Sequence, residues 1–116
     1  MKKEISKKET QSDYLNEVSL VGRLSGEPTE KSLPSGDKVV EFRIVIPRAG
    51  KPSKSKKGLV DTIDVAAWSP VNRKIALKLD ENTWISVNGA IRRRFWQSPT
   101  GLASRWQVEA SEIKSI

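Results

Sequence analysis

Side chains that could bind an anionic, aromatic ligand recur at every second position near residue 94, as Arg92, Arg94 and Trp96. Successive side chains of a β-strand point to opposite faces, so a strand here would present two guanidiniums and an indole together. Guanidiniums bind phosphates and flat rings stack on unpaired bases. The structural alternative is that Trp96 covers one end of the fold while the arginines solubilise the surface. Arg93 and Phe95 have the opposite parity, which leaves Trp96 with the arginines and favours binding.

Trp68 is the second candidate for a stacking ring. It ends an alternating pattern over residues 60–68 whose inward positions have the opposite parity, so we expect the indole on the outer face. The alternative is that it packs under the helix expected directly after it. For Trp84 and Trp106 a core position, a subunit interface and a binding platform all remain open.

Segment 48–58 carries four lysines, one arginine and no acid. Such a cluster repels itself unless an anion neutralises it, although solvated lysine-rich loops are common. Arg43, on the outward side of the strand before this segment, extends the basic track. The predicted nucleic-acid-binding residues are Arg43, Arg48, Lys51, Lys54, Lys56, Lys57, Trp68, Arg92, Arg94 and Trp96.

The composition argues against an enzyme. The 116 residues carry a formal charge of +7 and contain no histidine and no cysteine, which excludes thiolate nucleophiles, histidine acid–base chemistry and Cys/His metal sites. Asp61 and Asp64 are the close carboxylate pair on an expected strand, but their three-residue offset sends them to opposite faces. We therefore expect no catalytic residues, no metal and no cofactor.

The elements that must position these side chains are short strands separated by turn signals. Residues 1–15 are polar without an apolar period, which predicts a flexible tail, and residues 16–116 form the expected domain. Residues 26–38 are expected to be turns, and Gly22 and Gly89 inside strand patterns predict bulges or bends. The expected elements are strands at 17–24, 39–46, 60–68, 83–96 and 105–116, and a helix at 70–79 capped by Ser69.

This order predicts an all-β fold, a five-stranded oligonucleotide/oligosaccharide-binding (OB-fold) barrel with one short helix between the third and fourth strands. Inward positions are expected to include Ile63, Val65 and Ala67 in the third strand, with Ala66 outward. In the fourth strand we expect Ile91 inward.

The motifs along 16–24, 34–36, 39–46, 87–89 and 92–96 follow one another at spacings similar to those of the bacterial single-stranded DNA-binding proteins. The resemblance covers about Asn16 to Ile116. It implies binding of single-stranded DNA without strong sequence preference, in replication, recombination or repair, by a homotetramer or homodimer. Trp68 and Trp96 match family positions that stack on bases.

The chain also departs from that family. A position in the 48–58 loop and one near Thr62, which commonly carry stacking tryptophans, have no aromatic residue, and Asp64 adds an acid to the outward face. The last expected strand runs to Ile116, so we expect no acidic tip for recruiting repair enzymes. These departures keep open a tail-less primosomal or replication accessory OB protein that acts mainly through protein contacts, and RNA as the ligand.

The expected location is the cytoplasm, at the nucleoid. No apolar run approaches the ~18 residues that would span a membrane, and residues 1–15 lack the apolar core of a secretory signal. The expected partners are therefore single-stranded DNA and further copies of this chain, and not a membrane.

Overall fold

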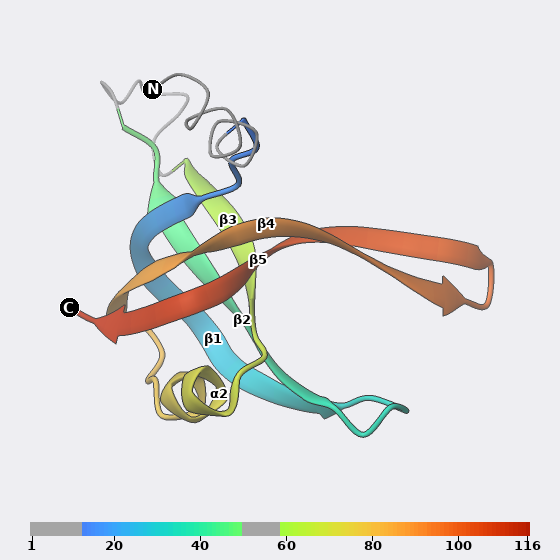
Figure 1. The fold of residues 1–116 in the computed structure, drawn as a ribbon. Helices are drawn as coiled ribbons and strands as arrows, with labels where there is room; N and C mark the ends of the chain where they lie inside the picture. The colour runs from blue at the N-terminus through green and yellow to red at the C-terminus, as the bar shows by residue number, and fades with distance from the viewer. Residues whose placement is uncertain (1–12, 50–58) are drawn as a thin grey trace, which may run out of the picture.

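The computed structural model describes residues 13–49 and 59–116 (Figure 1). The five strands close into a barrel in the order β1-β2-β3-β5-β4, with the single helix of the described residues after β3. The elements are β1 (Val18–Ser32), β2 (Lys38–Pro47), β3 (Val60–Ala67), α2 (Pro70–Leu77), β4 (Trp84–Ser98) and β5 (Gly101–Ser115). The all-β class, the barrel and the place of the helix are confirmed. No helix within the described ranges is long and apolar enough to cross a membrane.

Strand β1 is longer than the sequence predicts and serves two neighbours. Its first part pairs with β4 as far as Arg23, and from Arg23 onward it pairs with β2. The expectation of turns from residue 26 was wrong for 26–32, because a register shift between Ser25 and Thr29 absorbs Gly26 and Pro28 within the strand. Only the reversal around Gly36, which has a φ of 93°, is the turn expected from its sequence.

The barrel interior is filled by the alternating apolar positions of all five strands. The fully buried large side chains are Leu24, Val39, Val40, Ile44, Val65, Ile85 and Val87. Two parity predictions were wrong. Ala66 is buried rather than outward, at the point where β3 pairs with β5, and Ile91 is 45% exposed. Ile91 has the expected parity, but it lies where β4 leaves the barrel.

Helix α2 begins as its sequence predicts. The Ser69 side chain accepts a hydrogen bond from the Asn72 backbone N–H at 3.1 Å, and Pro70 occupies the first helical position. The Asn72 side-chain amide then donates to the carbonyl oxygens of Ala110 and Ser111 at 3.4 and 3.2 Å, which fixes the helix to β5. The helix ends at Leu77, two residues earlier than expected.

Strands β4 and β5 form a long hairpin that extends beyond the barrel (Figure 1). They pair from Ile85 and Ser115 to Ser98 and Gly101, with a register shift at Asn88 and Gly89. A bulge at Gly89 was expected from the sequence and is confirmed. At this point the backbone of β5 passes so close that a Cβ atom on residue 89 would overlap with the carbonyl oxygen of Glu109. Only glycine allows this approach.

We expect Gly89→Ala to destabilise the barrel by about 3 kcal/mol, because a rigid backbone carbonyl, not a flexible side chain, blocks the new methyl group. This would lower the melting temperature by well over 10 °C for a domain of this size. Thermal unfolding followed by circular dichroism measures the change, with Ser86→Ala on the same strand as the control. An unchanged melting temperature for Gly89→Ala would contradict the close approach of β5.

Candidate nucleic-acid interface

Five of the barrel's outward side chains form a continuous surface across four neighbouring elements. We call this surface the outer face; it consists of Arg43 of β2, Trp68 after β3, Arg94 and Trp96 of β4, and Arg105 of β5. Arg94 and Arg105 are direct partners in the β4–β5 ladder, and Arg43 is the ladder partner of Asp64 on β3. Strand pairing therefore brings together the arginines and tryptophans that alternation predicts for the outside of the sheet.

Glu41 on β2 is the anion at the centre of the outer face. Its carboxylate is contacted by Lys31 Nζ at 2.7 Å, Gln107 Nε2 at 2.8 Å and Arg94 Nη1 at 3.2 Å. Burial alone would raise the pKa of Glu41, but hydrogen bonds from Lys31 and Gln107 and the charges of Lys31 and Arg94 together hold it below its usual value of 4.5. This carboxylate connects β1, β2, β4 and β5 through side chains.

Asp64 on β3 is the second anion of the outer face. It pairs with Arg43 Nε at 3.0 Å and lies 3.9 Å from Arg105 Nε. The sequence analysis anticipated that Asp64 would share this face, and missed Arg105. The hairpin register, which pairs Arg105 with Arg94, is the signal that could have found it.

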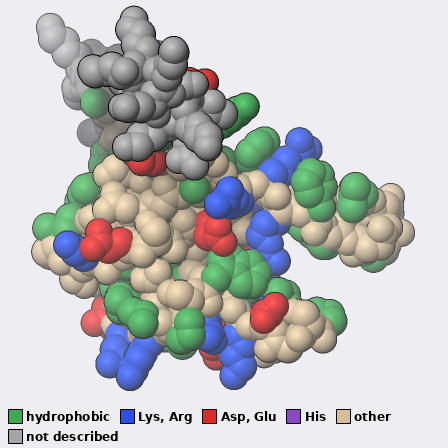
Figure 2. Space-filling view, in the orientation of Figure 1, with side chains coloured by type: hydrophobic (Ala, Val, Ile, Leu, Met, Phe, Trp, Pro, Cys, Tyr) green, Lys and Arg blue, Asp and Glu red, His purple; other side chains and the backbone are tan. Residues whose placement is uncertain are grey.

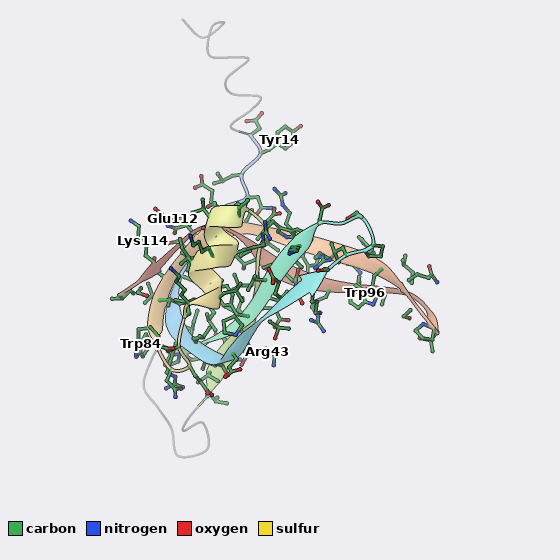
Figure 3. All side chains as sticks on the ribbon, turned by 90° about the horizontal axis from the view of Figure 1, so that it is seen from below. Tyr14, Arg43, Trp84, Trp96, Glu112 and Lys114 are labelled. Carbon is green, nitrogen blue, oxygen red and sulfur yellow. The ribbon has the colours of Figure 1, made fainter. Side chains whose placement is uncertain are left out.

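Each tryptophan of the outer face carries a guanidinium over its ring. Arg94 Cζ lies 4.9 Å from the ring centroid of Trp68, and Arg105 Cζ lies 6.0 Å from that of Trp96. These are cation–π distances. Trp68 is half-buried and Trp96 is 45% exposed, so both rings keep surface that a planar ligand could cover. Trp96 lies on the projecting hairpin, whereas Trp84 lies at the opposite end of the molecule (Figure 3).

Two hollows adjoin on the outer face. One, of about 420 Å³, is lined by Arg43, Asp64 and Arg105, and the other, of about 340 Å³, by Arg94, Trp96 and Arg105. Glu41 and Gln107 line both. The result is a shallow path with cations along it and an indole at one end, the shape that an extended chain requires rather than an enclosed small molecule.

The remaining predicted residues lie apart from this path or outside the described residues. Arg92 pairs with Glu109 at 2.9 Å, and Arg48 pairs with Asp61 at 3.1 Å, three ladder positions beyond Asp64. All four predicted arginines therefore have a carboxylate partner. The predicted lysines of the basic segment are outside the described residues; they are Lys51, Lys54, Lys56 and Lys57.

The acids of the interface serve the arginines. Residues 13–49 and 59–116 contain no group of three or more Asp or Glu side chains placed to hold a metal ion. The geometry therefore offers cation–anion and ring–ring contacts as its chemistry, with phosphates and bases as the matching ligand groups.

The model of the single-strand binding protein family matches residues 15–116. The single-stranded DNA-binding protein of Aquifex aeolicus is 27% identical over 103 residues, which cover 88% of this chain and 70% of the relative. That of Thermotoga maritima is 29% identical over 91 residues, with 76% and 63% covered, and that of Treponema pallidum is 24% identical over 102 residues, with 88% and 58% covered. The matched part thus spans roughly two thirds of these relatives' length.

Among solved structures, the Plasmodium falciparum SSB complex with ssDNA superposes on this chain with a TM-score of 0.72. The match covers 89% of this chain and 96% of that chain at 21% sequence identity. This likeness shows that the two chains share the fold.

We expect Glu41→Gln to lower the free energy of unfolding by about 1–2 kcal/mol at pH 7, because it removes the charge that Lys31, Arg94 and Gln107 contact. The folded-state pKa of Glu41 is depressed, so its contribution is present above about pH 4.5 and is lost as the pH falls below that value. Urea unfolding at a series of pH values measures the gap between wild type and variant, which should narrow under acid. Glu27→Gln, at an exposed position of β1, is the control; a gap that does not change with pH would contradict this assignment.

Proposed function

Since the chain belongs to the single-strand binding protein family, we propose that it binds single-stranded DNA on the outer face. The observation that carries the proposal is the alignment of Trp68 and Trp96 with three arginines along two adjoining hollows. Members of this family bind DNA and are not enzymes, in agreement with the expectation from composition.

In the proposed complex, bases stack on the indoles of Trp68 and Trp96 while phosphates contact the arginines. Stacking tolerates every base, because every base has a π-face, so the surface has no strong sequence preference. A duplex keeps its bases stacked on one another and offers only phosphates. Single strands are therefore the preferred ligand.

The arginines must exchange partners when DNA binds. Arg43 and Arg94 are held by Asp64 and Glu41 in the free protein, so a phosphate oxygen competes with a carboxylate for each guanidinium. The exchange keeps the arginines extended and pre-oriented before the ligand arrives. It also lowers the net gain per contact, because the displaced carboxylate stays close to the phosphate.

The proposal extends to the setting of this binding: replication, recombination or repair, at the nucleoid in the cytoplasm, by a homodimer or homotetramer. Exposed apolar side chains on neighbouring strands support self-association, since Val21 of β1 is 52% exposed and Trp84 of β4 is 45% exposed. Sedimentation velocity over a range of protein concentrations tests it. A monomer at all concentrations would argue against assembly.

Two alternatives are separated by the same titration. A replication accessory protein that acts through protein contacts would bind oligonucleotides weakly and lose little when a tryptophan is removed. A preference for RNA would appear when a ribose oligonucleotide of the same sequence binds more tightly than the deoxyribose one.

We expect Trp96→Ala to weaken binding to a deoxythymidylate oligonucleotide by roughly five- to 150-fold, the loss of about 1–3 kcal/mol of stacking. Trp84→Ala is the matched control, because both indoles are 45% exposed on the same strand and Trp84 is far from the outer face. Fluorescence anisotropy measures affinity, and the melting temperature and mass in solution are recorded for each variant. Equal affinity for Trp96→Ala and wild type would overturn the choice of binding face.

We expect Asp64→Asn to strengthen binding about two- to fivefold at low salt, because it frees Arg43 and Arg105 from their carboxylate partner. The gain should shrink as salt rises, since screening weakens the removed repulsion. Glu112→Gln, which removes a charge at the far end of the β4–β5 ladder (Figure 3), should leave affinity unchanged. For wild type, three arginine–phosphate contacts predict a log–log salt slope of roughly −2. A slope near zero would remove the arginines from the interface.

A further inference from the structure

The part of the β4–β5 hairpin beyond the barrel has two exposed faces, and the outer face occupies only one. Strand β1 pairs with β4 only as far as Gly89, and β3 pairs with β5 only at Val108 and Glu109. From Ile91 to Gln107 the two strands pair only with each other among the described strands. Side chains on the side opposite to Arg94 and Trp96 are therefore also open to a ligand.

We call this side the second face. It consists of Ile91, Arg93, Phe95, Leu102 and Trp106, and Arg93 is the ladder partner of Trp106. Its apolar members are more exposed than Trp96: Phe95 is 57%, Trp106 is 61% and Leu102 is 70% exposed. The space-filling view shows hydrophobic and basic side chains adjoining on the projecting hairpin (Figure 2).

Arg93 lies between the two rings of the second face. Its guanidinium carbon is 5.1 Å from the ring centroid of Phe95 and 5.5 Å from that of Trp106. Ser104 Oγ accepts hydrogen bonds from Arg93 Nε and Nη2 at 3.2 and 3.0 Å, which fixes the side chain over the sheet. A cation is thus held in place beside two exposed aromatic rings.

The charge of Arg93 differs from that of the other hairpin arginines. Arg92, Arg94 and Arg105 each lie within 4 Å of a carboxylate, whereas Arg93 has no such partner among the described residues. Residues 90–107 contain four arginines and no acid, so the hairpin itself supplies no anion for it. The anion that complements this position must come from a ligand.

We propose that the second face is an additional contact surface for single-stranded DNA, so that a bound strand passes around the hairpin and stacks on Trp106 and Phe95 as well as on Trp96. The proposal rests on the proposed function and adds a site to it. Exposed rings together with an unneutralised guanidinium are the pairing that base stacking and phosphate contact require. An interface between copies of the chain would instead bring Arg93 up against Arg93 or another basic strand, at a cost in repulsion.

The decisive experiment uses Trp106 as its own reporter. A variant carrying Trp68→Phe, Trp84→Phe and Trp96→Phe keeps aromatic rings at all three positions and leaves Trp106 as its only indole. Titration with a deoxythymidylate of about 16 nucleotides, the upper end of the site sizes of such barrels, should quench its emission. The matching variant with Trp84 as the only indole should not be quenched. Saturated binding without quenching of Trp106 overturns the proposal.

Affinities give the second readout. Trp106→Ala should weaken binding to the same oligonucleotide by roughly five- to 150-fold, and Arg93→Gln should reduce the magnitude of the log–log salt slope by roughly 0.7, one phosphate contact on a single strand. Both variants should melt as wild type does, since these side chains are outside the core. If Trp106→Ala changes the mass in solution and not the affinity, the second face joins copies of the chain and the proposal is wrong.

The same titrations separate the two levels of the argument. If the variant that keeps only Trp96 is quenched by the oligonucleotide and the one that keeps only Trp106 is not, the second face fails while the proposed function stands. If neither is quenched and anisotropy shows no binding, both fail.

Discussion

One half-buried carboxylate organises the charged surface of this barrel. Glu41 is within hydrogen-bond distance of groups from β1, β4 and β5, and it neutralises cations that would otherwise repel one another across the sheet. Its position on β2 follows from strand alternation, which places Val40 and Phe42 in the core with Glu41 between them. The placing of Arg94 over Trp68, and hence the spacing of the outer face, depends on this contact.

The balance of charge in the interface differs from what the total of +7 suggests. The arginines of the outer face are each near a carboxylate, so this surface carries little net charge for its number of cations. Selectivity for single strands then depends mainly on the exposed rings, since a surface with few free cations holds a duplex poorly. Arg93 is the exception among the hairpin arginines, and it is the one held between two rings.

Much of the fold could be predicted because alternation, turn residues and the Ser69-Pro70 cap are local signals. The length of β1 could not, since Gly26 and Pro28 signal a turn in the sequence but form a bulge once β2 supplies a partner. Alternation also says which side chains share a face and not whether anything covers that face. Ile91 has core parity and is nevertheless exposed, because the hairpin outruns the barrel. Arg105 required knowledge of the hairpin register.

The joint between β3 and β5 has a different consequence, for the order in which the barrel forms and opens. It is the only parallel pairing among the described strands, and it consists of Val65 with Val108 and Ala66 with Glu109. Closing it joins segments more than forty residues apart for only two ladder positions, so the loop entropy is recovered late in folding. The same joint has the fewest backbone hydrogen bonds to break during a local opening. Since Trp68 follows β3 directly, breathing of this joint moves one wall of the outer face relative to the other. The barrel can therefore adjust the spacing between its two stacking rings without unfolding the rest of the sheet.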